Sequence, residues 1–178
     1  YCMKFRSVVI FSGQKFKVPQ GIQRIDHRST HGWQLRYGGQ SKMFSDFSQD
    51  GTGAKVALAL ATEELMKRIQ KQPAPSRLQT ESSANKTSNL PVGISGPIVR
   101  KRPGQSVAEA NLAVSLPRFG QTALRRSVYI ANENTYTIER FQEALEKAVA
   151  MRDKAAKAYQ AAATKAKRAD ALLLVAKK

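Results

Sequence analysis

The sequence predicts an α+β protein made of two small domains, each a three-stranded antiparallel sheet packed on one helix. Three observations lead to this class. Short segments in which apolar and polar residues alternate, as in half-buried strands, occur in two groups of three. A helical pattern follows each group directly. A stretch rich in Pro, Ser, Thr and Asn separates the groups and has the composition of a linker.

The first domain is expected over residues 1–72. Its strands are expected at residues 21–28, 32–37 and 41–47. In the second of these strands, Trp33 and Leu35 alternate with polar residues, which is typical of a strand with one buried face. Residues 38–39 are both glycine and predict the turn to the third strand. A short apolar run at residues 8–11 precedes this group and resembles a strand as well.

A helix is expected over residues 54–69 of the first domain. Its large apolar residues recur at helical spacing near one stripe and should face the sheet. These residues are Val56, Leu60, Leu65 and Ile69. Alanines between them would allow the helix to approach the sheet closely.

Residues 73–91 are expected to form a flexible linker, because a structureless loop of this length inside one compact domain would be unusual. The second domain is expected over residues 92–178. Its strands are expected at residues 92–102, 110–116 and 124–130. A helix should begin near Ile138 and continue through a stretch of Ala and Lys without Gly or Pro.

That last helix is longer than its own sheet requires. A helix of some 40 residues spans about 60 Å, more than one small sheet can cover. Its distal part must therefore pack on another domain, pair with a second chain, lie on DNA, or fray. The second of these options makes the C-terminal helix a candidate surface for a homodimer.

The charge of the chain indicates a polyanionic partner. Lys and Arg number 30 against 13 Asp and Glu, so the formal net charge is +17. Such an excess suits duplex DNA, RNA or an anionic membrane surface, and among these it favours a nucleic acid.

Several other classes find no support in the sequence. No apolar run approaches the roughly 20 residues needed to span a bilayer, and the single cysteine, Cys2, excludes a disulfide framework. His27 and His31 are the only histidines, and their spacing suits one face of a helix rather than a strand. A phosphate-binding loop motif is absent. We therefore expect no enzyme activity, cofactor, metal, small-molecule ligand or membrane partner, and a cytoplasmic, nucleoid-associated location.

Particular residues carry a resemblance to a known family. In the first half they are Gly32-Trp33-x-Leu35-x-Tyr37, Phe44-x-Asp46 and the Ala-rich helix at residues 54–65; in the second half they are Val128-Tyr129-Ile130 and Ala144-Leu145-x-x-Ala148-x-x-x-Arg152-Asp153. Taken together, this pattern resembles two tandem copies of the Apetala-two/ethylene-response-factor DNA-binding domain, in its bacterial and phage versions. The second half lacks the tryptophan and has a longer helix, which leaves open whether both halves bind DNA in the same way.

The resemblance implies that each sheet packs one face on its helix and sets the other into the major groove of DNA, which is wide enough for such a sheet. The expected DNA contacts are then of two kinds. Strand residues that alternate with the core residues lie on the face turned toward DNA, and basic residues lie near the first strand of each half. In the first half these are Arg24, Arg28, Gln34, Arg36 and Met43. In the second half they are Arg100, Lys101, Arg102, Asn111, Ser115, Arg118, Arg125, Ser127 and Tyr129.

These expectations lead to a sequence-specific, non-enzymatic DNA-binding protein, a bacterial or phage transcription regulator. Two alternatives remain open at this point, and a third, a targeting fragment of a nuclease or integrase, ranks below them. One is an architectural, nucleoid-associated protein that binds DNA with little sequence preference. The other is an RNA-binding protein, for which Tyr129 is the candidate for stacking on a base.

Overall fold

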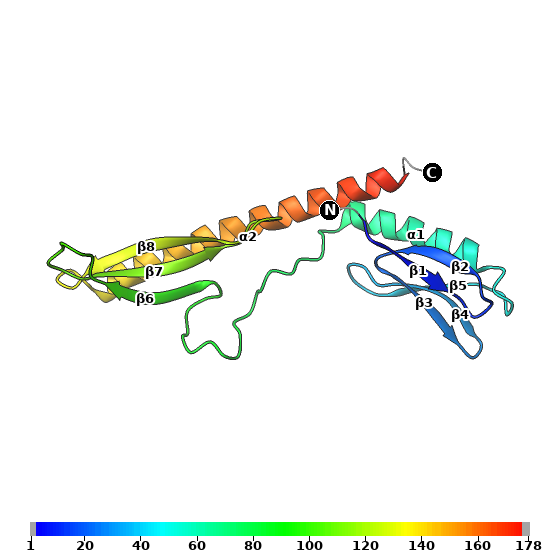
Figure 1. Ribbon diagram of the computed structural model, residues 1–178, viewed down its shortest axis with the longest axis horizontal. Coiled ribbons are helices and arrows are strands. Elements are labelled where there is room, and N and C mark those ends of the chain that lie inside the picture. The colour runs from blue at the N-terminus through cyan, green and yellow to red at the C-terminus, as the bar shows by residue number, and fades with distance from the viewer. Residues whose placement is uncertain (1–2, 176–178) are drawn as a thin grey trace. The chain divides into compact units, whose positions relative to one another are not determined.

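The computed structural model describes residues 3–175, so Cys2 lies outside the described residues. The described chain forms three antiparallel sheets, of two, three and three strands, and two helices (Figure 1). The predicted α+β class is confirmed, including a three-stranded sheet with a helix in each half and a second helix extended toward the C-terminus.

The elements follow the predicted order with one addition, a hairpin at the start of the chain. The strands are β1 (Phe5–Val9), β2 (Lys15–Pro19), β3 (Ile22–His27), β4 (Thr30–Leu35), β5 (Lys42–Ser45), β6 (Ile94–Arg100), β7 (Glu109–Leu116) and β8 (Leu124–Asn132). The helices are α1 (Ala54–Lys71) and α2 (Ile138–Val175). Residues 73–91, the expected linker, contain no helix or strand.

The chain divides into two compact units. Unit 1 comprises residues 1–75 and 163–178, and unit 2 comprises residues 76–162. Helix α2 therefore begins in unit 2 and ends in unit 1, whereas the sequence analysis placed all of residues 92–178 in a second domain. The reason is the burial of Ala171 in the unit 1 core and a hydrogen bond of 3.1 Å from the Ala74 amide to Oγ1 of Thr164.

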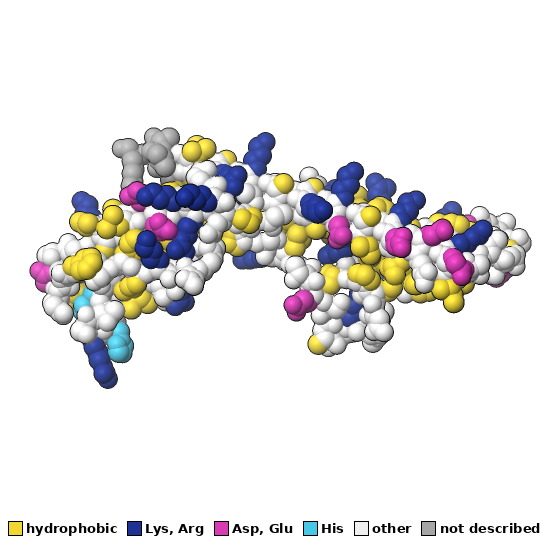
Figure 2. All heavy atoms as spheres, turned by 180° about the vertical axis from the view of Figure 1, so that it is seen from behind, with side chains coloured by type: hydrophobic (Ala, Val, Ile, Leu, Met, Phe, Trp, Pro, Cys, Tyr) yellow, Lys and Arg dark blue, Asp and Glu magenta, His cyan; other side chains and the backbone are white. Residues whose placement is uncertain are grey.

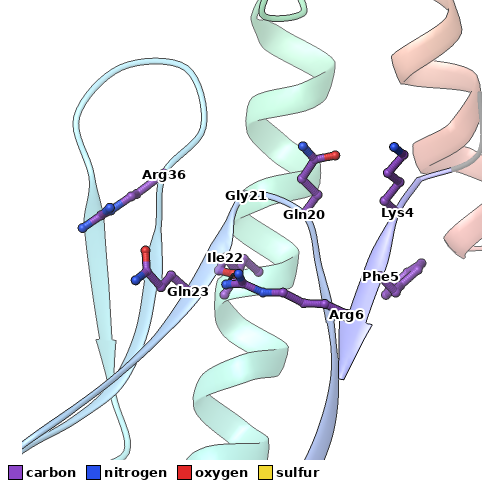
Figure 3. Close-up of a pocket in the computed structure, with 8 residues that line it drawn as sticks. All are labelled: Lys4, Phe5, Arg6, Gln20, Gly21, Ile22, Gln23 and Arg36. Atoms are coloured by element: carbon purple, nitrogen blue, oxygen red, sulfur yellow. Dashed lines mark hydrogen bonds between the residues drawn. The ribbon is translucent and has the colours of Figure 1, made fainter. Parts of the chain in front are cut away.

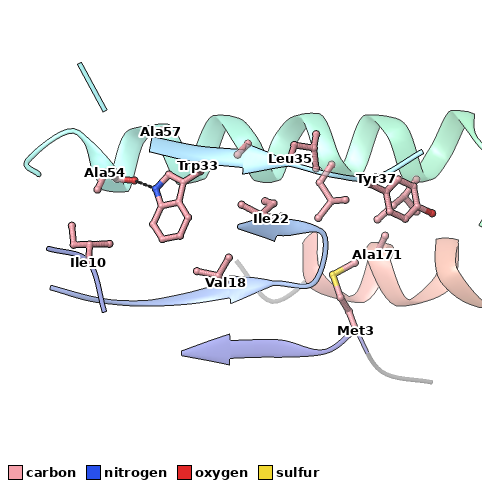
Figure 4. Packing of buried hydrophobic residues seen from close by; sticks show 13 residues of the cluster. Met3, Ile10, Val18, Ile22, Trp33, Leu35, Tyr37, Ala54, Ala57 and Ala171 are labelled. Carbon is pink, nitrogen blue, oxygen red and sulfur yellow. Dashed lines mark hydrogen bonds between the residues drawn. The ribbon is translucent and has the colours of Figure 1, made fainter. Parts of the chain in front are cut away.

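In unit 1, the sheet β3–β4–β5 buries one face against α1. Trp33 and Leu35 are fully buried on this face, as their alternation predicted. The Trp33 Nε1–H group donates a hydrogen bond of 2.8 Å to the carbonyl oxygen of Ala54, the first residue of α1 (Figure 4). This bond fixes the start of the helix against the middle strand.

The face that α1 buries agrees with the predicted stripe at Leu65 and Ile69 and differs from it at Val56 and Leu60. Val56 and Leu60 are 64% and 49% exposed, so the prediction that they face the sheet was wrong. The buried positions recur at spacings of three and four and are Ala54, Ala57, Ala61, Leu65 and Ile69. In the first half of α1 the buried positions follow the predicted ones by one residue. The small alanine side chains at these positions let the helix approach the sheet as closely as the hydrogen bond from Trp33 requires.

The hairpin β1–β2 is an element that the sequence analysis did not predict as a pair. Its strands are joined by a turn with Gly13 at a φ of 82°, a conformation that favours glycine. Val18 of β2 is fully buried in the same core, and the ring of Phe16 meets the ring of Trp33 edge-on at 5.7 Å between centroids. The hairpin thereby extends the core of unit 1.

In unit 2, the sheet β6–β7–β8 buries one face against the first part of α2 (Figure 1). Leu112 and Val114 of β7 are fully buried, and α2 contributes Ala144 and Ala148 to the same core. The pairing register of β6 with β7 shifts between Ser95 and Ile98. The buried residues of β7 have even numbers, so its odd-numbered residues lie on the opposite, outer face, as predicted.

Candidate functional site

The outer face of the sheet β3–β4–β5 is the face turned away from α1. Cross-strand register places Gln23, Gln34 and Met43 side by side in one row on this face. Arg36 follows β4 on the same parity, and its Nε–H group donates a hydrogen bond of 2.7 Å to Oε1 of Gln34. Three of the predicted contacts, Gln34, Arg36 and Met43, are therefore brought together.

Arg24 does not lie on this outer face. It pairs in register with Trp33, which places it on the inner face, and its side chain is only 6% exposed. Its Nη1 and Nη2 groups donate hydrogen bonds of 2.9 and 2.5 Å to the two carboxylate oxygens of Asp46, whose side chain is fully buried. The guanidinium also lies 4.9 Å from the Trp33 ring centroid. The Arg24 side chain is thus buried in an ion pair with Asp46 and does not face a DNA duplex, so we remove it from the candidate surface.

The electrostatics of this cluster follow from its burial and its charges. Burial by itself would lower the pKa of Arg24, but the hydrogen bonds and charges of Asp46 and Asp26 outweigh burial and raise that pKa. Burial would raise the pKa of Asp26, but hydrogen bonds from Arg24 and His31, with the charge of Arg24, hold it below its usual range. Both shifts favour the ionised forms of Arg24 and Asp26.

The outer face of the sheet β6–β7–β8 is lined by small and polar residues. Asn111 of the middle strand lies between Ile98 and Tyr129, and the next row joins Ser95, Ala113 and Ser127. A third row pairs Ser115 with Arg125. The register therefore brings together five predicted contacts on one face, which are Asn111, Ser115, Arg125, Ser127 and Tyr129. The Tyr129 side chain, on strand β8, is 51% exposed.

The remaining basic candidates lie at turns and strand ends. Arg28 is exposed in the β3–β4 turn with a φ of 48°. Arg102 lies 3.5 Å from a carboxylate oxygen of Glu109, so part of its charge is neutralised. Arg118 donates a hydrogen bond of 2.9 Å to the Thr122 carbonyl and closes the β7–β8 turn. These side chains border the outer faces instead of lying within them.

Arg100 and Lys101 lie with Arg102 at one end of the second sheet. Arg100 is the last residue of β6 and pairs with Glu109 at the start of β7. Arg118 follows the other end of β7. The predicted basic residues of unit 2 are therefore divided between the two ends of its sheet.

A pocket in unit 1 contains residues that the sequence analysis did not select. It has a volume of about 420 Å³ and opens between strand β1 and the start of β3 (Figure 3). Lys4, Arg6 and Arg36 supply three cations, and Gln20 and Gln23 supply amides. These segments are far apart in the sequence and meet only in the folded chain. The alternation of Lys4 and Arg6 with Phe5 was nevertheless a sequence signal of a strand with one basic face.

Over the wider surface, Lys and Arg side chains are spread in several groups on the face drawn in Figure 2. Among residues 3–175, no group of three or more His, Cys, Asp or Glu side chains is placed to hold a metal ion. Within the same range, no helix has the length and apolar content needed to cross a bilayer.

Comparison with known proteins gives no relative. No protein-family model, curated protein or solved structure matches this chain.

Proposed function

We propose that this is a non-enzymatic, double-stranded DNA-binding protein, a bacterial or phage transcription regulator associated with the nucleoid. In this proposal each three-stranded sheet is of the Apetala-two/ethylene-response-factor type and sets its outer face into a major groove. The observation that carries the proposal is the composition of the two outer faces. Each presents hydrogen-bonding side chains and an exposed arginine, while a helix buries the opposite face.

The exposed arginines are the groups best suited to read bases. Arg36 uses its Nε–H group on Gln34, and its two Nη groups are the ends of the fork that can bind O6 and N7 of guanine. Arg125 lies in the row of Ser115 on the second face. A bidentate pair of this kind contributes about 1–3 kcal/mol of discrimination between bases.

The net charge of +17 supports the same partner, because basic side chains that neutralise phosphates release counterions and so supply salt-dependent affinity. Phosphate contacts of this kind fix the position of the protein without reading sequence. Arg28, Arg100 and Lys101, at the borders of the outer faces, suit this role.

A second candidate is RNA binding, and the exposure of Tyr129 favours it specifically. An exposed aromatic ring on the outer face of an edge strand is a platform on which an unpaired base can stack, with about 1–3 kcal/mol per base. Asn111 lies beside Tyr129 and could bind the edge of such a base.

Mobility-shift titration tests the proposal after selection of a preferred site from randomised duplex DNA. Arg36→Ala and Arg125→Ala should each weaken binding to the selected site by roughly 5- to 150-fold, equivalent to about 1–3 kcal/mol. The matched control is Arg126→Ala, because Arg126 is the exposed neighbour of Arg125 but has the opposite parity on β8. It should change affinity less, and equally for all sequences.

Three outcomes contradict this proposal in different ways. Unchanged affinity and sequence preference in both arginine variants would exclude the sheet faces as the reading surface. Equal affinity of the wild type for selected and random duplexes would favour an architectural protein. Tighter binding to single-stranded RNA, lost in Tyr129→Ala, would favour the RNA-binding candidate.

A further inference from the structure

The pocket of unit 1 is built from three segments that are distant in sequence. Strand β1 and the residue before it supply Lys4, Phe5 and Arg6; the β2–β3 turn and β3 supply Gln20, Gly21, Ile22 and Gln23; and Arg36 follows β4. Backbone hydrogen bonds hold the segments together. The Gln20 amide donates to the Lys4 carbonyl at 2.9 Å, and the Arg36 amide donates to the Gly21 carbonyl at 2.7 Å.

Among the residues that the structure describes, the lining of this pocket is cationic and contains no acidic side chain. Arg6 is positioned by a hydrogen bond of 3.0 Å from Nη2 to the Ile22 carbonyl. Figure 3 shows its side chain extending from β1 toward Ile22 and Gln23. A guanidinium has five N–H donors, so this bond leaves most of them for a ligand. Lys4 and Arg6 with the two amide side chains form a donor set that suits a phosphate group.

The pocket is continuous with the outer face of the sheet. Gln23 lines the pocket and pairs in register with Gln34 on that face. Arg36 lines the pocket and is hydrogen-bonded to the same Gln34. A phosphate held by Lys4 and Arg6 would therefore lie at the border of the surface that we propose to enter the major groove.

We propose that this pocket binds a backbone phosphate of the DNA duplex whose major groove receives the outer face of the sheet β3–β4–β5. The inference rests on the proposed function. It gives the β1–β2 hairpin a role as a phosphate clamp, and the described residues of unit 2 contain no equivalent hairpin. Unit 1 would then contribute more salt-dependent affinity than its outer face alone can provide.

The salt dependence of duplex binding tests the inference with the full chain. The variants are Lys4→Ala, which removes an exposed cation, and Arg6→Gln, which keeps a donor for the Ile22 carbonyl. Each should reduce the slope of log affinity against log salt by about 0.9, the value for one phosphate contact, and leave sequence preference unchanged. Lys55→Ala is the control, because Lys55 is equally exposed but lies on α1, which covers the other face of the sheet.

The outcomes separate this inference from the proposed function. No duplex binding by the wild type would overturn both. Wild-type binding with the same slope in Lys4→Ala, Arg6→Gln and Lys55→Ala would overturn the phosphate clamp and leave the proposed function intact. In a second arm, amide chemical shifts are followed during titration with inorganic phosphate. If phosphate binds at Gln20 and Gln23 while the two pocket variants keep the wild-type slope on DNA, the pocket serves a free phosphate and the inference fails.

Discussion

The two units use the same order of three strands and a helix, yet they fill their cores differently. In unit 1 the helix contributes mostly alanine to the buried stripe, and the sheet contributes one very large side chain, Trp33. In unit 2 the helix likewise buries alanines, Ala144 and Ala148, but the largest fully buried side chains of the sheet are of medium size, namely Ile94, Leu112 and Val114. One arrangement of strands is thus compatible with a core that depends on a single residue and with one that is spread over many.

The polar content of the two cores differs as well. Unit 1 buries an ion pair, Arg24 with Asp46, beneath the Trp33 ring, and closes its core with the β1–β2 hairpin. Among the described residues, the buried polar or charged residue is Asp46, which belongs to unit 1. Replacing either residue of this ion pair should therefore lower the stability of unit 1 in a way that has no counterpart in unit 2.

The largest expected effect is on the Trp33 core. Trp33→Ala should lower the free energy of unfolding by about 3–5 kcal/mol, because it leaves a cavity and also removes the bond to the Ala54 carbonyl. Leu112→Ala, the comparison in unit 2, should cost less than Trp33→Ala, within the range of about 2–5 kcal/mol for such changes. Urea unfolding followed by circular dichroism measures both. An equal or greater loss in Leu112→Ala would contradict the contrast between the two cores.

The buried ion pair gives the next effect. Arg24→Ala leaves Asp46 buried without its partner and should destabilise unit 1 by about 3–5 kcal/mol. Arg125→Ala, at an exposed position of unit 2, should change the free energy of unfolding by no more than about 0.5 kcal/mol. Hydrogen exchange of β4 and β7 amides assigns each loss to a unit. A stable Arg24→Ala protein with weakened DNA binding would restore Arg24 as a surface contact.

A smaller effect concerns pH. The pKa of Asp26 in the folded protein lies below its ordinary value of about 3.8. Ionised Asp26 therefore stabilises unit 1 above that value, and this contribution is lost as the pH falls through the folded pKa. Urea unfolding at neutral pH and at several lower pH values should show a shallower acid loss in Asp26→Asn than in the wild type. Glu146→Gln, on the exposed part of α2 in unit 2, is the control and should follow the wild-type curve.

The smallest effect tests the orientation of α1. Val56→Ala should change the free energy of unfolding by at most about 0.5 kcal/mol, since the side chain is exposed and alanine favours helix. Leu65→Ala in the same helix should cost about 2–5 kcal/mol because Leu65 is fully buried. If the two variants lost similar stability in thermal or urea unfolding, the predicted stripe through Val56 would be the correct one.

Local pattern was sufficient to predict most elements of this fold. Alternation around Trp33 and along residues 110–116 predicted the buried faces of β4 and β7, because a strand has a strict period of two. The same reasoning assembled Gln34, Arg36 and Met43 on one surface. Glycines at residues 38–39 correctly marked the turn before β5.

What the pattern could not provide was the identity of long-range partners. Arg24 was assigned to the DNA-contact surface as a basic residue of the first strand, and its partner Asp46 is 22 residues away in sequence. The first half of the helix stripe was misplaced because hydrophobicity ranks Val56 above the small Ala57, while close packing requires the smaller side chain. The pocket around Arg6 forms only when the hairpin meets β3.

The division of α2 between the units has a consequence for synthesis of the chain. Unit 1 includes residues near both ends, and its core contains Ala171 as well as Met3. About 100 residues are added between Pro75 and Ala171, which takes roughly 5–20 s at ordinary rates of chain elongation. The strands and helix of unit 1 up to residue 75 therefore wait for the end of α2 to complete their core, and unit 2 has all its residues earlier.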